Sequence, residues 1–169
     1  MEALDRRIVQ LLAGDGRMSY TDLGRSTGLS TSAVHQRVRR LEERGVIRGY
    51  RAVVDYEEAR IPVTALISIT PFDPAAPDDV PDRLRHIPAI DSCFSVAGEE
   101  SYVLKVRVSG PGELEDLLAA VRAAANVTTR TTVVLSTPWE DRSPLSSAPE
   151  ETAELAPTAA DVTSTDRVP

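Results

Sequence analysis

The 169-residue sequence has few residues of several types, and each shortage excludes a class of protein. It has one cysteine, Cys93, so it can form neither a disulfide framework nor a cysteine-rich metal site. No apolar run approaches the roughly 18 residues of a membrane-spanning helix. The first residues are charged and helical in period, unlike the apolar core of a secretion signal. We therefore expect a cytoplasmic protein with no metal site and no membrane segment.

The side-chain groupings that enzymes use for catalysis are also missing. We find no paired nucleophile and base, no glycine-rich phosphate loop and no histidine–cysteine cluster. His35 and His86 are the only histidines. The sequence therefore predicts a protein that is not an enzyme and that needs no cofactor.

Positive charge is confined to one end of an acidic chain. The formal net charge is −7, yet residues 1–55 hold ten Arg against seven Asp and Glu, which is net +3. The other 114 residues hold nine Lys and Arg against nineteen acids, which is net −10. This asymmetry indicates that only the first part of the chain meets a polyanion.

Three helices are predicted in this basic part. The first covers residues 3–13, where leucine and isoleucine recur with helical spacing. The second is short, begins at a Ser19 or Thr21 cap and ends at a glycine. The third follows a Ser30 cap and covers about residues 31–44. Two helices joined by a short turn that contains glycine are the outline of a helix-turn-helix.

A β-prone stretch, "VIRGYRAVVD" over residues 46–55, follows the third helix. It is typical of a two-stranded wing, or of a single strand that leads to a linker. We therefore assign residues 1–55 to a winged helix-turn-helix DNA-binding domain and residues 56–62 to a linker.

Residues 63–137 are predicted to form a second domain of ferredoxin-like βαββαβ order, so the fold class is α+β. The predicted elements are strands at 63–70, 89–98, 101–110 and 127–136, with helices at 80–87 and from Pro111. Residues 138–169 are rich in Pro, Ser, Thr, Ala and acids, without periodicity, and are predicted to be a disordered acidic tail. The tail is either a solvated extension or a regulatory, partner-binding segment.

The third helix has a polar face that suits the major groove of DNA. Val34, Val38 and Leu41 form the buried stripe. Glutamine can pair with adenine, arginine with guanine and serine with either. The residues opposite the stripe are Ser32, Gln36, Arg39 and Arg40, with His35 at the flank.

The remaining residues of this face are predicted to contact the DNA backbone. Thr31 and Ser32 begin the helix, where free N–H groups favour phosphate. Arg37 lies on the other flank, so we expect it to reach phosphate or neighbouring backbone rather than a base. An arginine-rich face can also be simply solvated, but the helix-turn-helix outline and the confined charge favour DNA binding.

The motifs of this part resemble the Lrp/AsnC, or feast/famine, family of transcriptional regulators. They are Leu4-Asp5, Asp15-Gly16-Arg17, the run from Leu29 to Arg37 and the run from Leu41 to Tyr50. The second half has the βαββαβ order of the family's effector domain, and "CFSVAGEESYVLKVRV" is most similar to the actinobacterial branch. The resemblance covers about residues 3–137 and implies a sequence-specific DNA-binding regulator that responds to a small effector.

The resemblance also implies an effector site in the turn "VAGEESYVLKV". Family members commonly carry Gly-Asp-x-Asp-Tyr here, and the loop contributes to an amino-acid site between dimers. Glycine allows a close approach to the backbone, and N–H groups in a tight turn can hold a carboxylate. Glu99 or Glu100 could accept an ammonium group, although an ordinary hairpin turn with exposed acids fits as well. In this sequence the family's positions are Gly98 and Tyr102, which match, and Glu99 and Ser101, which differ, with Glu100 between them.

The second domain is expected to pair with a second copy. Its strands carry few aromatic residues, so an open sheet would leave an apolar face uncovered. A homodimer would cover that face and would place two recognition helices on one DNA; the resemblance implies further assembly to an octamer. Cys93 is expected to be a small core residue rather than a redox sensor. The alternative function is an amino-acid sensor or interaction module that does not bind DNA.

Overall fold

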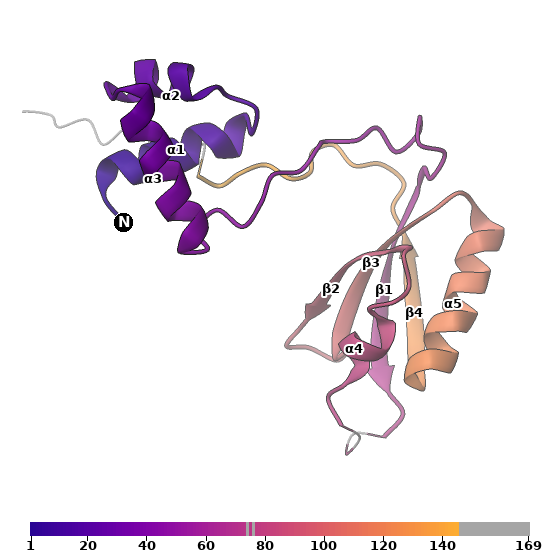
Figure 1. Ribbon diagram of the computed structural model, residues 1–169. Helices are drawn as coiled ribbons and strands as arrows, with labels where there is room; N and C mark the ends of the chain where they lie inside the picture. Colours follow the sequence, from indigo (N-terminus) through magenta and orange to yellow (C-terminus); the bar gives the residue numbers. More distant parts are fainter. Residues whose placement is uncertain (74, 76, 146–169) are drawn as a thin grey trace, which may run out of the picture. The chain divides into compact units, whose positions relative to one another are not determined.

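The structure is a computed structural model that describes residues 1–73, 75 and 77–145. The described chain forms two compact units (Figure 1), residues 1–50 with 141–145, and residues 51–140. Most of the predicted acidic tail, from residue 146 onward, lies outside the described residues. No helix of the described part is long and apolar enough to cross a membrane.

The first unit contains the three predicted helices, α1 (Ala3–Gly14), α2 (Tyr20–Thr27) and α3 (Thr31–Glu43). The Ser19 hydroxyl accepts a hydrogen bond from the backbone N–H of Asp22 at 3.1 Å, and Ser30 accepts one from that of Ala33 at 3.3 Å. These serine caps satisfy N–H groups that the first helical turn leaves free. Gly28 ends α2 with φ +71°, in the left-handed region. The predicted helix boundaries are therefore confirmed.

One small core holds the three helices together. Its fully buried members are Ile8, Leu23, Val34, Val38 and Leu41. Gly24 makes this packing possible, because a Cβ at that position would lie 2.6 Å from the carbonyl oxygen of Leu29. The backbone of α2 and the turn before α3 thus approach so closely that glycine is required.

The prediction of wing strands is wrong, because no residue of 44–62 is in a strand. Val53 and Val54 are exposed and pair with none of the described strands, although they belong to the unit that holds the sheet. A two-stranded hairpin alone is marginal in water, so β-prone residues without a covering layer do not form one here. Residues 56–60, in the predicted linker, form turns.

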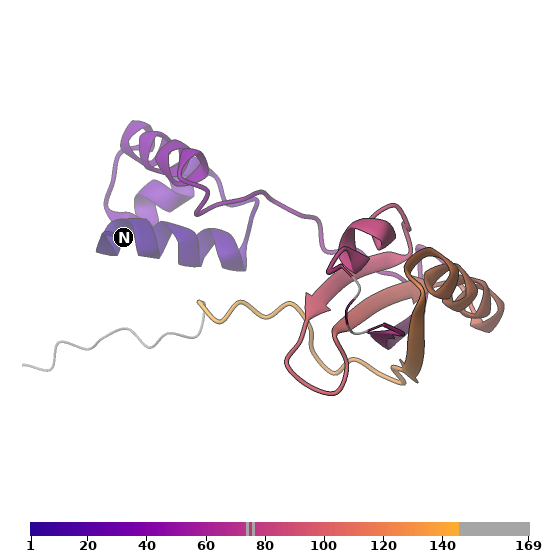
Figure 2. The same cartoon turned by 90° about the horizontal axis from the view of Figure 1, so that it is seen from below.

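The second unit has the predicted βαββαβ order, and its sheet is antiparallel with strand order β2-β3-β1-β4. Both helices lie on the same side of the sheet (Figures 1 and 2), where they share one apolar core with the strands. The elements are β1 (Val63–Pro71), α4 (Val80–Leu84), β2 (Ile90–Ser95), β3 (Tyr102–Val108), α5 (Pro111–Ala125) and β4 (Val127–Val133).

Several elements of this unit are shorter than predicted. Helix α4 ends at Leu84 rather than at residue 87, and Pro88 disfavours helical geometry at Ile87. Strands β2 and β3 are joined by a six-residue loop, 96–101, instead of a two-residue turn.

The other side of the sheet, which no helix covers, is called the open face below. Strand alternation directs Leu66 and Ser68 of β1 to this face, and the register pairs place Phe94, Val103 and Arg130 there. Leu66 and Phe94 are 37% and 52% exposed. Large apolar side chains therefore remain uncovered on the open face of the single chain.

Cys93 is exposed, so the prediction that it is a core residue is wrong. It lies on β2, an edge strand, next to a hollow of about 290 Å³ that the short helix α4 leaves uncovered. Partial burial raises the pKa of the Cys93 thiol, which reduces the fraction present as reactive thiolate.

Candidate DNA-binding and effector sites

The outer face of α3 is polar and open to solvent. Val34, Val38 and Leu41 point into the core, as predicted, which directs the opposite side chains outward. Arg40 donates a hydrogen bond from Nε to the backbone carbonyl of Gln36 at 3.4 Å. This bond leaves the side-chain amide of Gln36 available. The exposed members of the predicted site are Thr31, Ser32, His35, Gln36, Arg39 and Arg40.

The contacts that these side chains make within the domain lie at its surface. Arg39 forms an ion pair with Glu43 at 2.8 Å, but their side chains are 71% and 57% exposed. An exposed pair of this kind contributes little, so phosphate or a base edge can replace Glu43. The ring of His35 packs edge-on against Tyr20, with ring centroids 5.4 Å apart. His35 therefore has one side against α2.

Arg37 is held within the domain, which sequence reasoning did not predict. Its Nη1 lies 2.8 Å from the Glu2 carboxylate and 2.7 Å from that of Asp5. Asp5 is buried at 8% exposure, so the pair ties α3 to the start of α1. Hydrogen bonds to Glu2 and then to Asp5 raise the pKa of Arg37. A phosphate contact by Arg37 stays a prediction, and it would have to share a guanidinium that already has two acidic partners.

The predicted effector residues gather in the loop 96–101 at one end of the sheet. The N–H of Val96 donates to the Ser101 carbonyl at 3.1 Å, and the N–H of Ser101 donates to that of Ile69 at 3.1 Å. Gly98 and Glu99 are exposed at the tip. Glu99 makes no ion pair or side-chain hydrogen bond with any residue that the structure describes. Glu99 is thus the acid in this loop whose charge is available to a ligand.

Glu100 is turned back onto the open face. Its carboxylate accepts a hydrogen bond from the Ser68 hydroxyl at 2.9 Å and pairs with Arg130 at 3.3 Å. The bond from Ser68, with the help of Arg130, lowers the pKa of Glu100. The sequence did not distinguish the two acids of the loop, but in the structure only Glu99 has a carboxylate that is not already paired within the described residues.

Tyr102, which directly follows the loop, is anchored in the core of the second unit. Its side chain is buried at 4% exposure, and its hydroxyl donates to the carboxylate of Asp78. This bond links the start of β3 to the loop that precedes α4. Because Tyr102 is buried and its hydroxyl is engaged with Asp78, its predicted contact with an effector stays a prediction.

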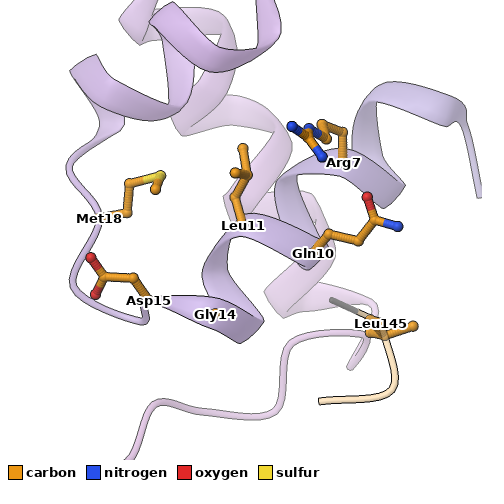
Figure 3. A pocket seen from close by; sticks show the side chains of 7 residues that line it. All are labelled: Arg7, Gln10, Leu11, Gly14, Asp15, Met18 and Leu145. Atoms are coloured by element: carbon orange, nitrogen blue, oxygen red, sulfur yellow. The ribbon is translucent and has the colours of Figure 1, made fainter. Parts of the chain in front are cut away.

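A second hollow, of about 300 Å³, lies in the first unit beside the end of α1 (Figure 3). It contains none of the predicted site residues. Its lining consists of Arg7, Gln10, Leu11, Gly14, Asp15, Met18 and Leu145. Among the described residues, no group of three or more His, Cys, Asp and Glu side chains could hold a metal ion.

Comparison with known proteins assigns both units. Residues 1–48 match the profile of winged helix-turn-helix DNA-binding domains, and residues 63–144 match that of the Lrp/AsnC ligand binding domain. The HTH-type transcriptional regulator LrpA of Mycobacterium tuberculosis is 51% identical over 142 residues, which cover 84% of this chain and 95% of LrpA. The chain belongs to the Lrp/AsnC family. Its similarity to an actinobacterial Lrp/AsnC protein agrees with the branch that the sequence motifs indicate.

Solved Lrp/AsnC structures have the same fold. The crystal structure of M. tuberculosis LrpA matches with a TM-score of 0.80 at 50% identity and covers 86% of this chain and 99% of its own. The feast or famine regulatory protein of M. tuberculosis complexed with L-methionine matches with a TM-score of 0.83 at 51% identity and covers 85% and 98%. This Lrp/AsnC protein is thus a DNA-binding transcriptional regulator with a ligand-binding domain, and the family profile extends to residue 144, past the predicted boundary at 137.

Proposed function

We propose that this regulator reads the major groove with α3 and that an amino acid, bound at the loop 96–101, changes its DNA binding or its assembly. The observation that carries the proposal is the exposed polar face of α3 above its buried stripe. Gln36, Arg39 and Arg40 are the residues proposed to contact base edges. Thr31 and Ser32 at the helix start, with Arg37 at the flank, are proposed to contact phosphate.

The effector is proposed to be a free α-amino acid. Backbone N–H groups at the tip of the loop, at Gly98 and Glu99, can bind its carboxylate, and Glu99 is the charged partner available for its ammonium group. The complex of the related M. tuberculosis protein with L-methionine supports this ligand class. A ligand acts on DNA binding only if it prefers one state of the protein over another.

The active species is proposed to be a homodimer that packs through the open face and assembles further to an octamer. Exposed Leu66 and Phe94 support the open face as the dimer surface. A dimer also provides two α3 helices for two half-sites of one duplex. We expect the protein to act in the cytoplasm, without a cofactor and without a catalytic reaction.

The test is DNA binding by the full chain. A labelled duplex from the region upstream of its own gene and a scrambled duplex are titrated by fluorescence anisotropy, with and without each of twenty amino acids. We expect preference for the upstream duplex and a shift with at least one amino acid. Equal, weak binding to both duplexes would instead favour an amino-acid sensor that does not bind DNA.

A further inference from the structure

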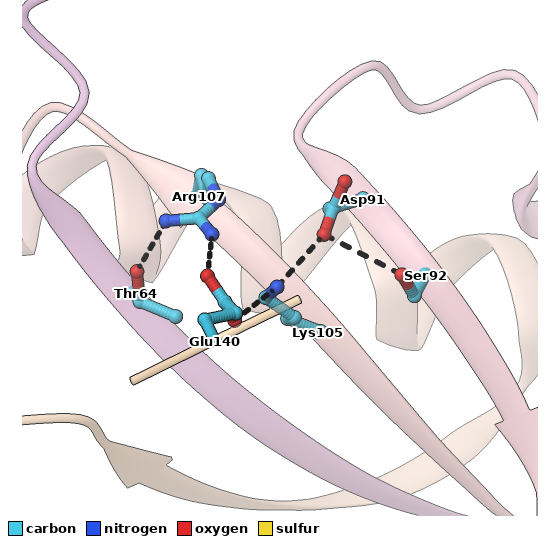
Figure 4. A network of polar contacts seen from close by, with 6 residues as sticks. All are labelled: Thr64, Asp91, Ser92, Lys105, Arg107 and Glu140. Atoms are coloured by element: carbon cyan, nitrogen blue, oxygen red, sulfur yellow. Dashed lines mark hydrogen bonds and ion pairs between the residues drawn. The ribbon is translucent and has the colours of Figure 1, made fainter. Parts of the chain in front are cut away.

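Two cations lie almost buried on the open face of the sheet (Figure 4). Lys105 and Arg107 are two residues apart on β3, so their side chains point to the same side. Those side chains are only 15% and 11% exposed. Burying a charge is costly unless it is paired, so the groups that pair with these two cations decide whether the face is stable.

One carboxylate from the C-terminal segment pairs with both cations. Glu140 Oε1 lies 2.5 Å from Lys105 Nζ, and Oε2 lies 2.8 Å from Arg107 Nη2. Asp91 also pairs with Lys105, at 3.2 Å. Figure 4 shows Glu140 between the two cations, on a segment that crosses this side of the sheet. This residue belongs to the stretch that the sequence assigned to the tail.

Arg107 has no other acidic partner among the described residues. Its Nη1 donates to the Thr64 hydroxyl at 3.0 Å, and its guanidinium carbon lies 3.8 Å from the centre of the Tyr56 ring. Its Nε is buried and has no hydrogen-bond partner in the described chain. Without Glu140, the guanidinium charge would therefore be held by a hydroxyl and an aromatic ring alone.

The positive and negative charges that form ion pairs on the open face are equal in number. The cations are Lys105, Arg107 and Arg130, and the acids paired with them are Asp91, Glu140 and Glu100. Three positive and three negative charges sum to zero. Removal of Glu140 leaves one uncompensated positive charge on each copy, and two copies that pack face to face would bring two such charges together.

We propose that Glu140 is a dimerisation residue: it neutralises the open face so that a second copy of the chain can pack against it. The inference rests on the proposed homodimer and adds to it the C-terminal segment as a necessary part of the interface. In this dimer, Leu66 and Phe94 supply the apolar contact, and Glu140 keeps the contacting face electrically neutral.

The experiment is sedimentation of the full chain over a concentration series at low salt, which gives the dimer dissociation constant. We expect Glu140→Gln to raise this constant by about tenfold or more, because it leaves a desolvated charge unpaired. Asp141→Asn is the matched control. It removes the adjacent acid, which is exposed and has no ion pair among the described residues, and we expect no change.

A compensating variant separates charge balance from folding. The double change Glu140→Gln with Arg107→Gln removes further contacts but restores a neutral face on which Lys105 stays paired with Asp91, so we expect most of the dimer affinity to return. If the double variant dimerises more weakly than Glu140→Gln alone, or if Glu140→Gln and Asp141→Asn behave alike, the role of Glu140 is overturned while the dimer stands. If the unmodified chain is monomeric, or if Leu66→Asp leaves the dimer unchanged, the proposed dimer surface itself fails.

Discussion

Arg37 and Gln36 are neighbours in sequence but face different partners. Gln36 is exposed on the outer face of α3, whereas Arg37 is bound by Asp5 and Glu2 at the start of α1. One of these side chains is open to solvent, and the other holds two helices together. Substitutions at the two positions should therefore be distinguishable by combining DNA binding with thermal unfolding.

Removal of a base-reading side chain should affect specific DNA most. We expect Gln36→Ala or Arg40→Ala to weaken binding to the preferred duplex by roughly 1–3 kcal/mol and to reduce the preference over a scrambled duplex. Unfolding temperature should not change, because both side chains are exposed. Anisotropy titrations with the two duplexes measure both quantities. Unchanged affinity and preference in both variants would show that this face of α3 does not enter the groove.

Removal of the Arg37 side chain should lower the unfolding temperature and weaken binding to all duplexes evenly. The physical reason is that buried Asp5 loses its cationic partner and α1 is held less firmly against α3. Differential scanning calorimetry of Arg37→Ala, of Asp5→Asn and of the double variant gives the coupling between the two positions. Strictly additive effects would mean that the pair does not join the helices.

The turn between α2 and α3 depends on one close backbone contact. Gly24 faces the Leu29 carbonyl oxygen, where a Cβ would lie at 2.6 Å. We expect Gly24→Ala to destabilise the first unit by about 1–3 kcal/mol, as overpacking does. Gly14→Ala is the matched control, since a Cβ there meets nothing within 4 Å. Chemical denaturation followed by circular dichroism measures both, and equal stability of the two variants would contradict the close approach.

The loop 96–101 should bind ligand through its backbone and one acid. We expect Gly98→Asp to abolish the response to amino acids without unfolding the domain, because the nearest atom to a new Cβ is Glu100 Oε2 at 3.8 Å. Glu99→Gln should weaken binding more than Glu100→Gln, since Glu100 is engaged with Ser68 and Arg130. Calorimetry with twenty amino acids is the measurement. Full response in Gly98→Asp would remove this loop from the effector site.

Sequence patterns within a few residues predicted most helices and strands, but they could not predict contacts between residues far apart in the sequence. Serine caps, glycine exits and apolar spacing mark the three helices of the first unit, and these rules act within a few residues. The absence of wing strands depends instead on what else is available for 46–55 to pair with. The Arg37–Asp5 pair joins residues 32 apart in sequence: helical periodicity sets Arg37 apart from Arg39 and Arg40, but no local pattern indicates its acidic partner. Exposed Cys93 has the same cause, because the length of α4 determines what covers β2.

At the scale of the whole molecule, residue 140 separates two parts of the predicted tail. Glu140 contacts β3, and the Lrp/AsnC ligand binding profile continues to residue 144. Composition alone assigned residues 138–169 to one segment, because proline and acids dominate throughout. The charge of Glu140 gains its importance only from Lys105 and Arg107, 33 to 35 residues earlier in the sequence.

A chain truncated after Leu145 should therefore keep the fold and the dimer. It retains Glu140 and loses only the acidic residues 146–169, which lie outside both family profiles. We expect unchanged unfolding temperature and unchanged sedimentation. Truncation after Pro138, which removes Glu140 as well, is the comparison and should weaken the dimer. A large fall in unfolding temperature for the longer truncated chain would assign a structural role to residues 146–169.

Strand β3 has a further consequence for how the second unit works. Loop 96–101 leads into Tyr102 at one end of the strand, while Arg107 near the other end touches both Tyr56, from the segment that enters the unit, and Glu140, from the segment that leaves it. Seven residues of extended chain span about 23 Å. The segments that connect the two units therefore both contact the strand that follows the loop, and the backbone of β3 joins the proposed effector loop directly to these contacts.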